Sequence, residues 1–240
     1  MSLLKSYHYS SHQGPFLKIN EDSVECDVST NLYLLIDAFG GQGIGDKICD
    51  FVKTEFRRFY HNLTDDPDST LPFYYNPLYS IESNALVNAT KRVSEHVWKQ
   101  NQKENPRFSG GLSLTALSID GLHAHLCSVG ANLVIHYRDN NIHFLNAPEK
   151  ELSFNFRHGV NPVLNAIGLT ADPELSIRDF FLREGDKLII LSDGIYERLS
   201  WGDLKETITC YHYNDVIEVL TNLANDKGNR DNQSGIVLCF

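Results

Sequence analysis

Two apolar segments that lie far apart in the chain each end in an aspartate followed by glycine-containing sequence. The first is NLYLLIDAFGGQGIGDKICDF at residues 31–51, and the second is DKLIILSDGIYERL at residues 186–199. A short run rich in Leu and Ile predicts a buried strand, and the glycines after each aspartate predict a turn. Aspartates at the ends of buried strands can converge at one rim of a sheet assembly. This repeated pattern therefore limits the folds that the chain can adopt.

The hydrophobic periodicity changes along the chain. Apolar residues recur every three or four positions at about 45–60 and 80–102, which predicts two long helices separated by a proline-containing loop at 62–79. The period then shortens, which predicts successive antiparallel strands with tight turns at 112–120, 122–130, 132–139 and 141–147. Later elements are expected as a strand at 187–192, helices near 201–208 and 214–226, and a strand at 234–240. Because strands and helices do not alternate regularly, an α+β fold is favoured over a doubly wound parallel sheet.

The composition disfavours several classes of protein. The net charge of −10 disfavours non-specific nucleic-acid binding, because that binding needs many Lys and Arg contacts to phosphate. No apolar stretch approaches the about 18 residues of a membrane span, and the first residues lack the long apolar core of a signal peptide. The cysteines form no C-x-x-C pair, which disfavours a zinc ribbon. We therefore expect a cytoplasmic protein that binds neither nucleic acid nor membrane.

Three aspartates stand at strand ends in sequence that contains glycine, serine or asparagine. Asp37 ends the first buried strand, Asp193 follows the strand at 187–192, and Asp231 precedes the last strand. Taken singly, each is compatible with an ordinary turn or loop. If they meet, their charges repel one another unless a cation lies between them. Oxygen-only ligands favour Mg²⁺ or Mn²⁺ over zinc, so these aspartates are candidate ligands of a hard cation.

The sequence around these aspartates resembles a known enzyme family, the metal-dependent protein phosphatase 2C or PPM serine/threonine phosphatases. The resemblance extends over nearly the whole chain. The blocks that carry it occur in the family's order: NEDSV (20–24), LIDAFGGQGIG (35–45), SGGLSLTALSIDGLHAHLCSVGAN (109–132), LIILSDGIYERLS (188–200) and GNRDNQSGIVL (228–238). The last two blocks are specific, and the combination is stronger than any single block.

The resemblance implies a fold, an activity and partners. The fold is one domain over residues 1–240, in which two antiparallel sheets form a sandwich between helix pairs, with a shortened flap segment at about 148–165. The activity is hydrolysis of phosphoserine and phosphothreonine in proteins by a water that two Mn²⁺ or Mg²⁺ ions activate. The partners are then a phosphorylated protein substrate and an opposing serine/threonine kinase.

The same resemblance assigns catalytic and metal-binding residues by their positions in the blocks. Asp37 would bridge both ions, and Asp193 and Asp231 would complete the ligands of the first ion. The backbone carbonyl of Ala38 would bind the second ion. The side chains of Glu21 and Asp22 would hold the waters of that ion.

Two departures from the family pattern affect the expected chemistry. Ala131 stands where the family has an aspartate that helps to bind a third metal in bacterial members. Its side chain has no ligand atom, so a third ion bound in that way is not expected. Phe39 stands where some members have a proton-donating histidine, so we expect a packing residue there and protonation of the leaving group by water.

A third departure affects phosphate binding. Leu17 occupies the position of the family's phosphate-binding arginine, and Lys18 is the adjacent cation. If this segment is an ordinary strand, Lys18 shares a face with Asn20 and Asp22 rather than with Glu21. Lys18 is therefore a possible phosphate-binding residue, with a solvated surface lysine as the equal alternative.

Two other functions are compatible with parts of the sequence. Leu17 and Ala131 favour a catalytically weak or inactive family relative that acts as a regulatory or binding module. Retention of all three aspartates argues against that reading. A nucleotide-binding protein could use GGQGIG as a phosphate loop, but this segment lacks the Lys-Ser/Thr ending of a P-loop.

Overall fold

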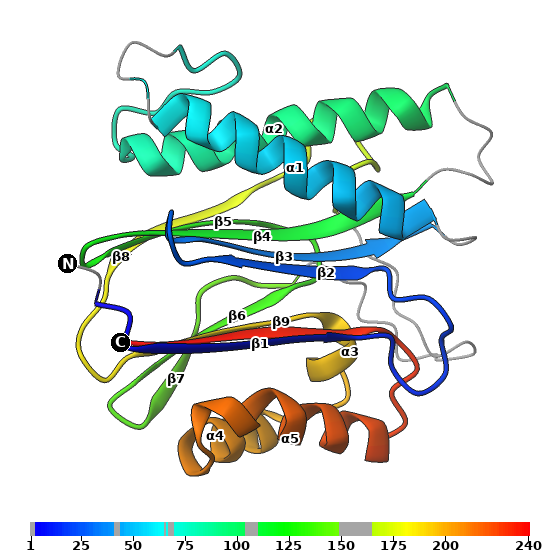
Figure 1. Ribbon diagram of the computed structural model, residues 1–240, viewed down its shortest axis with the longest axis vertical. Coiled ribbons are helices and arrows are strands. Elements are labelled where there is room, and N and C mark those ends of the chain that lie inside the picture. Colours follow the sequence, from blue (N-terminus) through cyan, green and yellow to red (C-terminus); the bar gives the residue numbers. More distant parts are fainter. Residues whose placement is uncertain (1–2, 41–43, 65, 67–69, 104–109, 149–164) are drawn as a thin grey trace.

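The computed structural model describes residues 3–40, 44–64, 66, 70–103, 110–148 and 165–240. Two antiparallel five-stranded sheets pack face to face (Figure 1). The first sheet contains, in spatial order, β1 (Ser6–His12), β10 (Gln233–Cys239), β9 (Lys187–Leu191), β6 (Leu133–Arg138) and β7 (Asn141–Phe144). The second sheet contains β2 (Asp22–Asp27), β3 (Leu32–Phe39), β4 (Gly111–Asp120), β5 (His123–Val129) and β8 (Ser176–Phe181).

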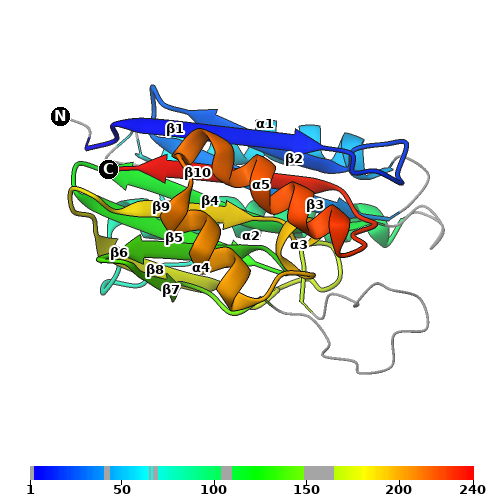
Figure 2. The same cartoon turned by 90° about the horizontal axis from the view of Figure 1, so that it is seen from below.

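Helices cover the outer face of each sheet. The long helices α1 (Ile44–Thr64) and α2 (Ile81–Asn101) lie on the second sheet, and α4 (Trp201–Cys210) and α5 (Tyr213–Asp226) cross the first sheet (Figures 1 and 2). The short helix α3 (Asp193–Tyr196) follows β9 at one end of the sandwich. This α-β-β-α order confirms the α+β sandwich predicted from the sequence.

Alternation along the central strands divides the apolar residues between separate cores. In β3, Leu32, Leu34 and Ile36 pack in the core beneath α1 and α2, whereas Tyr33 and Leu35 pack in the core between the two sheets. A third core lies between the first sheet and α4 and α5. Every second residue of β3, counted from Tyr33, therefore points toward the opposite sheet.

Most of the predicted helices and strands are confirmed, with three differences. Helix α1 continues to Thr64, so residues 62–64 are helical and not part of the loop. Strands β5 and β6 do not pair with each other but belong to different sheets, and the crossover begins at Gly130 with φ of 92°. Strands β1, β2 and β8 and helix α3 were not predicted, because the strands are partly exposed and polar and the helix is one turn long.

The described residues bear only in part on two further predictions, the flap segment and the absence of a membrane span. The flap segment at about 148–165 falls almost entirely on residues 149–164, which lie outside the described residues. Among the described helices, none combines the length and the apolarity that crossing a membrane requires.

A buried ion pair ties the two sheets together at the end of β9 that is remote from α3. Arg138 donates from Nε to Asp186 Oδ1 at 2.8 Å and from Nη2 to Asp186 Oδ2 at 2.5 Å. The same Nη2 donates to the carbonyl oxygen of Phe181 in the other sheet, at 2.8 Å. His136 Nε2 lies 3.1 Å from Asp186 Oδ2, and the backbone N–H of Arg183 donates to Oδ2 at 2.8 Å. Asp186 thus accepts several charge-assisted hydrogen bonds in a buried position.

These contacts decide the charge state of Asp186. Burial disfavours its ionised form, but the hydrogen bonds from Arg138, the Arg183 backbone and His136 outweigh burial and hold the pKa of Asp186 below its usual value. A carboxylate with a lowered pKa stabilises the folded protein above the unfolded-state pKa of about 4, and this contribution is lost as the pH falls through the folded-state pKa.

We predict that Asp186→Asn lowers the free energy of unfolding at pH 7 by about 1–3 kcal/mol, because the buried side chain at position 186 loses its charge-assisted hydrogen bonds and the half-buried Arg138 loses its carboxylate partner. Urea denaturation measures the loss. The difference from the wild-type protein should shrink below about pH 4. The matched control is Asp120→Asn, a change at an exposed carboxylate at the end of β4. An equal loss in both variants would contradict the role of the buried pair.

Candidate functional site

Two aspartates of the second sheet lie opposite each other and face the first sheet. In the antiparallel pairing of β2 with β3, Asp22 is the partner of Asp37, and Asp37 pairs on its other side with Ser113 of β4. Asp37 has the same parity as Tyr33 and Leu35, whose side chains are in the core between the sheets. Directly opposed residues have Cβ atoms about 5 Å apart. Asp22 and Asp37 are therefore neighbours at the end of the space between the sheets.

The first sheet brings Asp193 and Asp231 to the same end. Asp193 is the first residue of α3, directly after Ser192, whose Oγ accepts a hydrogen bond from the N–H of Ser234 at 2.9 Å. A Cβ atom on Gly194 would lie 1.9 Å from the carbonyl oxygen of Asn232 and 3.3 Å from Asp231 Cβ. Only glycine permits this close approach, which places α3 against the segment that carries Asp231.

The charge state of Asp22 depends on burial and on carboxylates of the first sheet. Asp22 is 7% exposed. Burial, together with the charges of Asp193 and Asp231, raises the pKa of Asp22 to about 8 against hydrogen bonds from Ser234 and Ser192. Burial likewise raises the pKa of Tyr196 in α3, where the largest contributions from charges come from Asp193 and Asp37. Strand pairing thus places Asp22 beside Asp37, and the close approach at Gly194 places Asp193 beside the Asp231 segment. Asp22, which the resemblance assigned to the waters of the second ion, is the most buried carboxylate of β2 and β3.

Glu21 is held beside these aspartates by a buried asparagine that sequence reasoning did not identify. Asn232 is 4% exposed, and its Oδ1 accepts the N–H of Glu21 at 2.9 Å. Its Nδ2 donates to the carbonyl oxygens of Gln13 at 2.9 Å and Ile19 at 3.0 Å. The Glu21 side chain accepts the N–H of Gly45 at 3.2 Å, at the start of α1. The only sequence signal for this role was the position of Asn232 directly after Asp231.

The crossover between the sheets connects both halves of the site. Ala131 is fully buried, and its N–H donates to Ser113 Oγ at 2.9 Å. The hydroxyl of Tyr196 donates to the carbonyl oxygen of Ala131, and Asn132 Nδ2 donates to the carbonyl oxygen of Leu35 at 3.1 Å. The segment therefore links β3 and β4, which carry and flank Asp37, to α3, which carries Asp193. Ala131 contributes only backbone atoms.

The other predicted site residues have simpler surroundings. Ala38 is buried in β3 directly after Asp37. Lys18 is exposed, and residues 13–21 form a loop, so the alternation of an ordinary strand does not apply to Lys18. Phe39 packs against Gly111, where an added Cβ would lie 2.6 Å from the Phe39 ring. Phe39 is thus a packing residue, as predicted.

The donor set suits a hard divalent cation, although its side chains are not gathered as ligands. Asp22, Asp37, Asp193 and Asp231 offer only oxygen atoms, the donors that Mg²⁺ and Mn²⁺ prefer. Within the described residues, Asp22 Oδ2 is buried without a hydrogen-bond partner. Within the same residues, no three His, Cys, Asp or Glu side chains lie together as a ready metal site. Side-chain rotations are therefore required to bring these oxygens to ligand distance, and metal binding stays a prediction.

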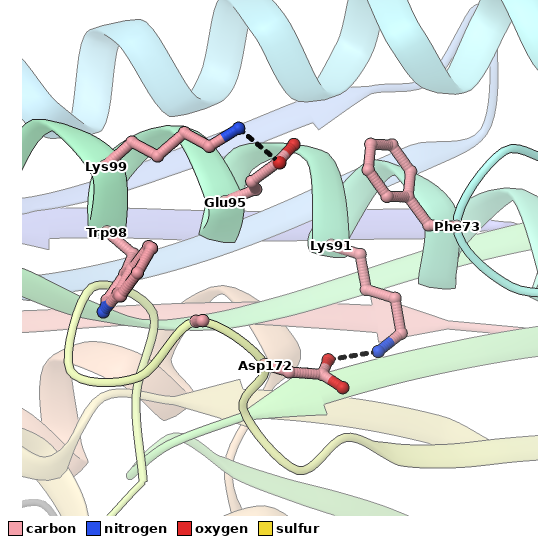
Figure 3. A pocket seen from close by; sticks show the side chains of 7 residues that line it. Phe73, Lys91, Glu95, Trp98, Lys99 and Asp172 are labelled. Atoms are coloured by element: carbon pink, nitrogen blue, oxygen red, sulfur yellow. Dashed lines mark hydrogen bonds and ion pairs between the residues drawn. The ribbon is translucent and has the colours of Figure 1, made fainter.

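A separate pocket of about 290 Å³ lies between α2 and the segment at residues 171–172 (Figure 3). None of the candidate site residues lines it. Its charged groups already pair with one another, since Lys91 contacts Asp172 and Lys99 contacts Glu95 (Figure 3). We therefore place the candidate site at the aspartates and not in this pocket.

Comparison with known proteins gives a clear result for the fold. No protein-family model matches the sequence, and no curated protein matches it. Solved structures do match. PppA, a key regulatory component of the T6SS in Pseudomonas aeruginosa, is 21% identical, with a TM-score of 0.78 and 98% of each chain covered. The PPM Ser-Thr phosphatase MsPP from Mycobacterium smegmatis is 19% identical, with a TM-score of 0.74 and 100% of each chain covered.

A third match was solved with metal. The catalytic domain of the serine/threonine protein phosphatase PstP, in complex with two manganese ions, is 21% identical with a TM-score of 0.74. The match covers 98% of this chain and 97% of that one. The chain therefore has the fold of the PPM serine/threonine phosphatases over its whole length.

We predict that Asp22→Asn stabilises the metal-free protein. Because its pKa is raised to about 8, Asp22 is protonated in the folded protein at pH 7 but ionised in the unfolded chain, so folding must bind a proton. The neutral amide has nearly the same shape and needs no proton, so the free energy of unfolding at pH 7 should rise by about 1–3 kcal/mol. Urea denaturation in the presence of chelator measures the change. Asp50→Asn, at an exposed position of α1, is the control and should leave stability nearly unchanged. A less stable Asp22→Asn protein would contradict this cost of burying the Asp22 carboxyl group.

Proposed function

We propose that this chain is an Mn²⁺- or Mg²⁺-dependent phosphatase that hydrolyses phosphoserine and phosphothreonine in proteins. The observation that carries the proposal is the meeting of Asp22, Asp37, Asp193 and Asp231, from both sheets, at one end of the sandwich. The PPM fold that the chain shares with serine/threonine phosphatases supports it.

Each candidate residue has a role in this proposal. Asp37 would contact two cations, and Asp193 and Asp231 would complete the ligands of one of them. The carbonyl oxygen of Ala38 would bind the other cation, and the side chains of Glu21 and Asp22 would hold waters on that cation. When bound, the cations supply Lewis acidity and a water that is deprotonated near neutral pH. The manganese ions in the PstP catalytic domain support this cofactor choice.

Residues around the site position the carboxylates and limit the groups that could act as proton donor or nucleophile. The backbone contacts of Gly194 and Asn232 fix the carboxylates relative to one another. Phe39 has no proton to give, so the leaving oxygen takes its proton from water. Cys49 lies near the aspartates, but burial raises the pKa of its thiol, which donates to the Glu21 carbonyl. A thiol in that state is a poor nucleophile, so direct attack by water on phosphorus is favoured.

The partners follow from the same proposal. A phosphorylated protein is the substrate, and a serine/threonine kinase in the cytoplasm opposes the reaction. Lys18 is exposed near the site and is a possible phosphate-binding residue, although as a lysine it lacks the bidentate geometry of arginine. The net charge of −10 continues to disfavour nucleic acid as a substrate.

A regulatory module that binds without catalysis is the second candidate. Ala131 and Leu17 favour it, because they replace an acidic and a basic group of the family pattern. PppA, which shares the fold, is described as a regulatory component. Retention of Asp37, Asp193 and Asp231 favours catalysis instead, because a pure binding module has no use for the repulsion among their carboxylates.

We predict that Asp37→Asn and Asp193→Asn each lower kcat/KM by at least about a hundredfold, since each removes a charged metal ligand. Hydrolysis of an aryl phosphate and of a phosphothreonine peptide, with Mn²⁺, Mg²⁺ or chelator, measures the effect. Asp203→Asn is the matched control and should keep full activity, while circular dichroism checks the fold of each variant.

The outcomes separate the two candidate functions. Turnover that survives chelation, or that persists in both aspartate variants, would contradict the metal mechanism. Tight Mn²⁺ binding by the wild-type protein without any turnover would favour the regulatory module.

A further inference from the structure

The loop between β1 and β2, residues 13–21, exposes three large apolar side chains beside the candidate site. Phe16 is 65% exposed, Leu17 41% and Ile19 46%. Single exposed apolar residues are common, but three within four positions form a patch that needs an explanation. In this loop the patch contributes nothing to the described cores.

The loop is tied to the residues of the site. Asn232 donates hydrogen bonds to the carbonyl oxygens of Gln13 and Ile19, at 2.9 and 3.0 Å. Gly14 has φ of 77°, and an added Cβ would lie 2.3 Å from the carbonyl oxygen of Asp231. Both ends of the apolar stretch are therefore held against the Asp231 segment, and the exposed side chains border the aspartates.

Two cations accompany the patch. The Arg230 guanidinium lies 6.0 Å from the centre of the Phe16 ring, and Arg230 directly precedes Asp231. Lys18 is exposed between Leu17 and Ile19. Neither cation forms an ion pair with a carboxylate in the part of the chain that the structure describes. In an acidic protein, unpaired cations beside a patch at the site favour an anionic ligand.

We infer that the β1–β2 loop binds the polypeptide that flanks the phosphorylated residue and selects substrates with a bulky apolar side chain two residues from phosphoserine or phosphothreonine. The inference rests on the proposed phosphatase function. Arg230 and Lys18 attract the phosphate dianion, and the apolar side chain covers Phe16, Leu17 and Ile19. A single strand of substrate can do both, because side chains two residues apart in an extended peptide point to the same face and lie about 6.6 Å apart along the chain.

An anionic lipid surface is the other class of ligand with which exposed apolar and basic residues interact. The net charge of −10 opposes that choice, because an anionic bilayer repels a protein of the same sign. The peptide is therefore favoured, and lipid binding becomes an outcome of the test.

The test compares two phosphothreonine peptides that differ only in the second residue after phosphothreonine, Leu in one and Ser in the other. We expect wild-type protein with Mn²⁺ to prefer the Leu peptide about tenfold in kcat/KM, mainly through KM, because the apolar contact is made on binding. In Phe16→Ser the preference should fall to about twofold or less. Leu78→Ser removes an 88% exposed apolar residue in the loop before α2, and this control should keep the wild-type preference.

An aryl phosphate assayed with the same preparations separates failure of this inference from failure of the proposed function. If the aryl phosphate is hydrolysed but the two peptides react equally, or if Phe16→Ser keeps the preference, the inference is overturned and the phosphatase function stands. If neither peptide nor aryl phosphate reacts, the proposed function falls and the inference falls with it. A third outcome would assign the patch to a membrane and overturn the inference. In that outcome the wild-type protein sediments with phosphatidylserine vesicles, Phe16→Ser abolishes the sedimentation, and the two peptides react equally.

Discussion

Repulsion among Asp22, Asp37, Asp193 and Asp231 is the constraint on which the organisation of this molecule depends. Each carboxylate raises the free energy of placing the others nearby, and burial of Asp22 adds to that cost. The arrangement persists because apolar cores lie between the sheets and beneath both helix layers and hold the strand ends in place. The packing of these cores therefore offsets the free-energy cost of placing the carboxylates together.

The aspartates are positioned mainly by backbone contacts rather than by contacts of their own side chains. Gly194 lies so close to Asn232 that no other residue fits, and Asn232 in turn holds Glu21 and both ends of the β1–β2 loop. The Ala131 segment joins the two sheets at the same place. A rigid backbone around charged side chains is suited to a cation site, because the carboxylates can rotate onto an ion while their anchor points stay fixed.

The surface around the site differs in character from the site itself. The candidate site is acidic, whereas the bordering loop exposes Phe16, Leu17 and Ile19 and lies beside the cation Arg230. The family resemblance could not indicate this border, because Leu17 stands where the family has arginine. A substrate that carries both a phosphate and an apolar neighbour would complement the two parts of this surface.

The sequence by itself determined the fold class, the main helices and strands, and the choice of the three aspartates as candidates. Strand alternation and helical periodicity are visible over a few neighbouring residues, and the family blocks are recognised by their order along the chain. It did not reveal β1, β2, β8 or α3, whose short or polar segments carry no strong period. Only the tertiary structure decided that β5 and β6 belong to different sheets, that Asp22 lies opposite Asp37, and that Asn232 joins the loop to the site. Those relations join residues as far as 219 positions apart, and such contacts depend on strand pairing and sheet packing rather than on any local pattern.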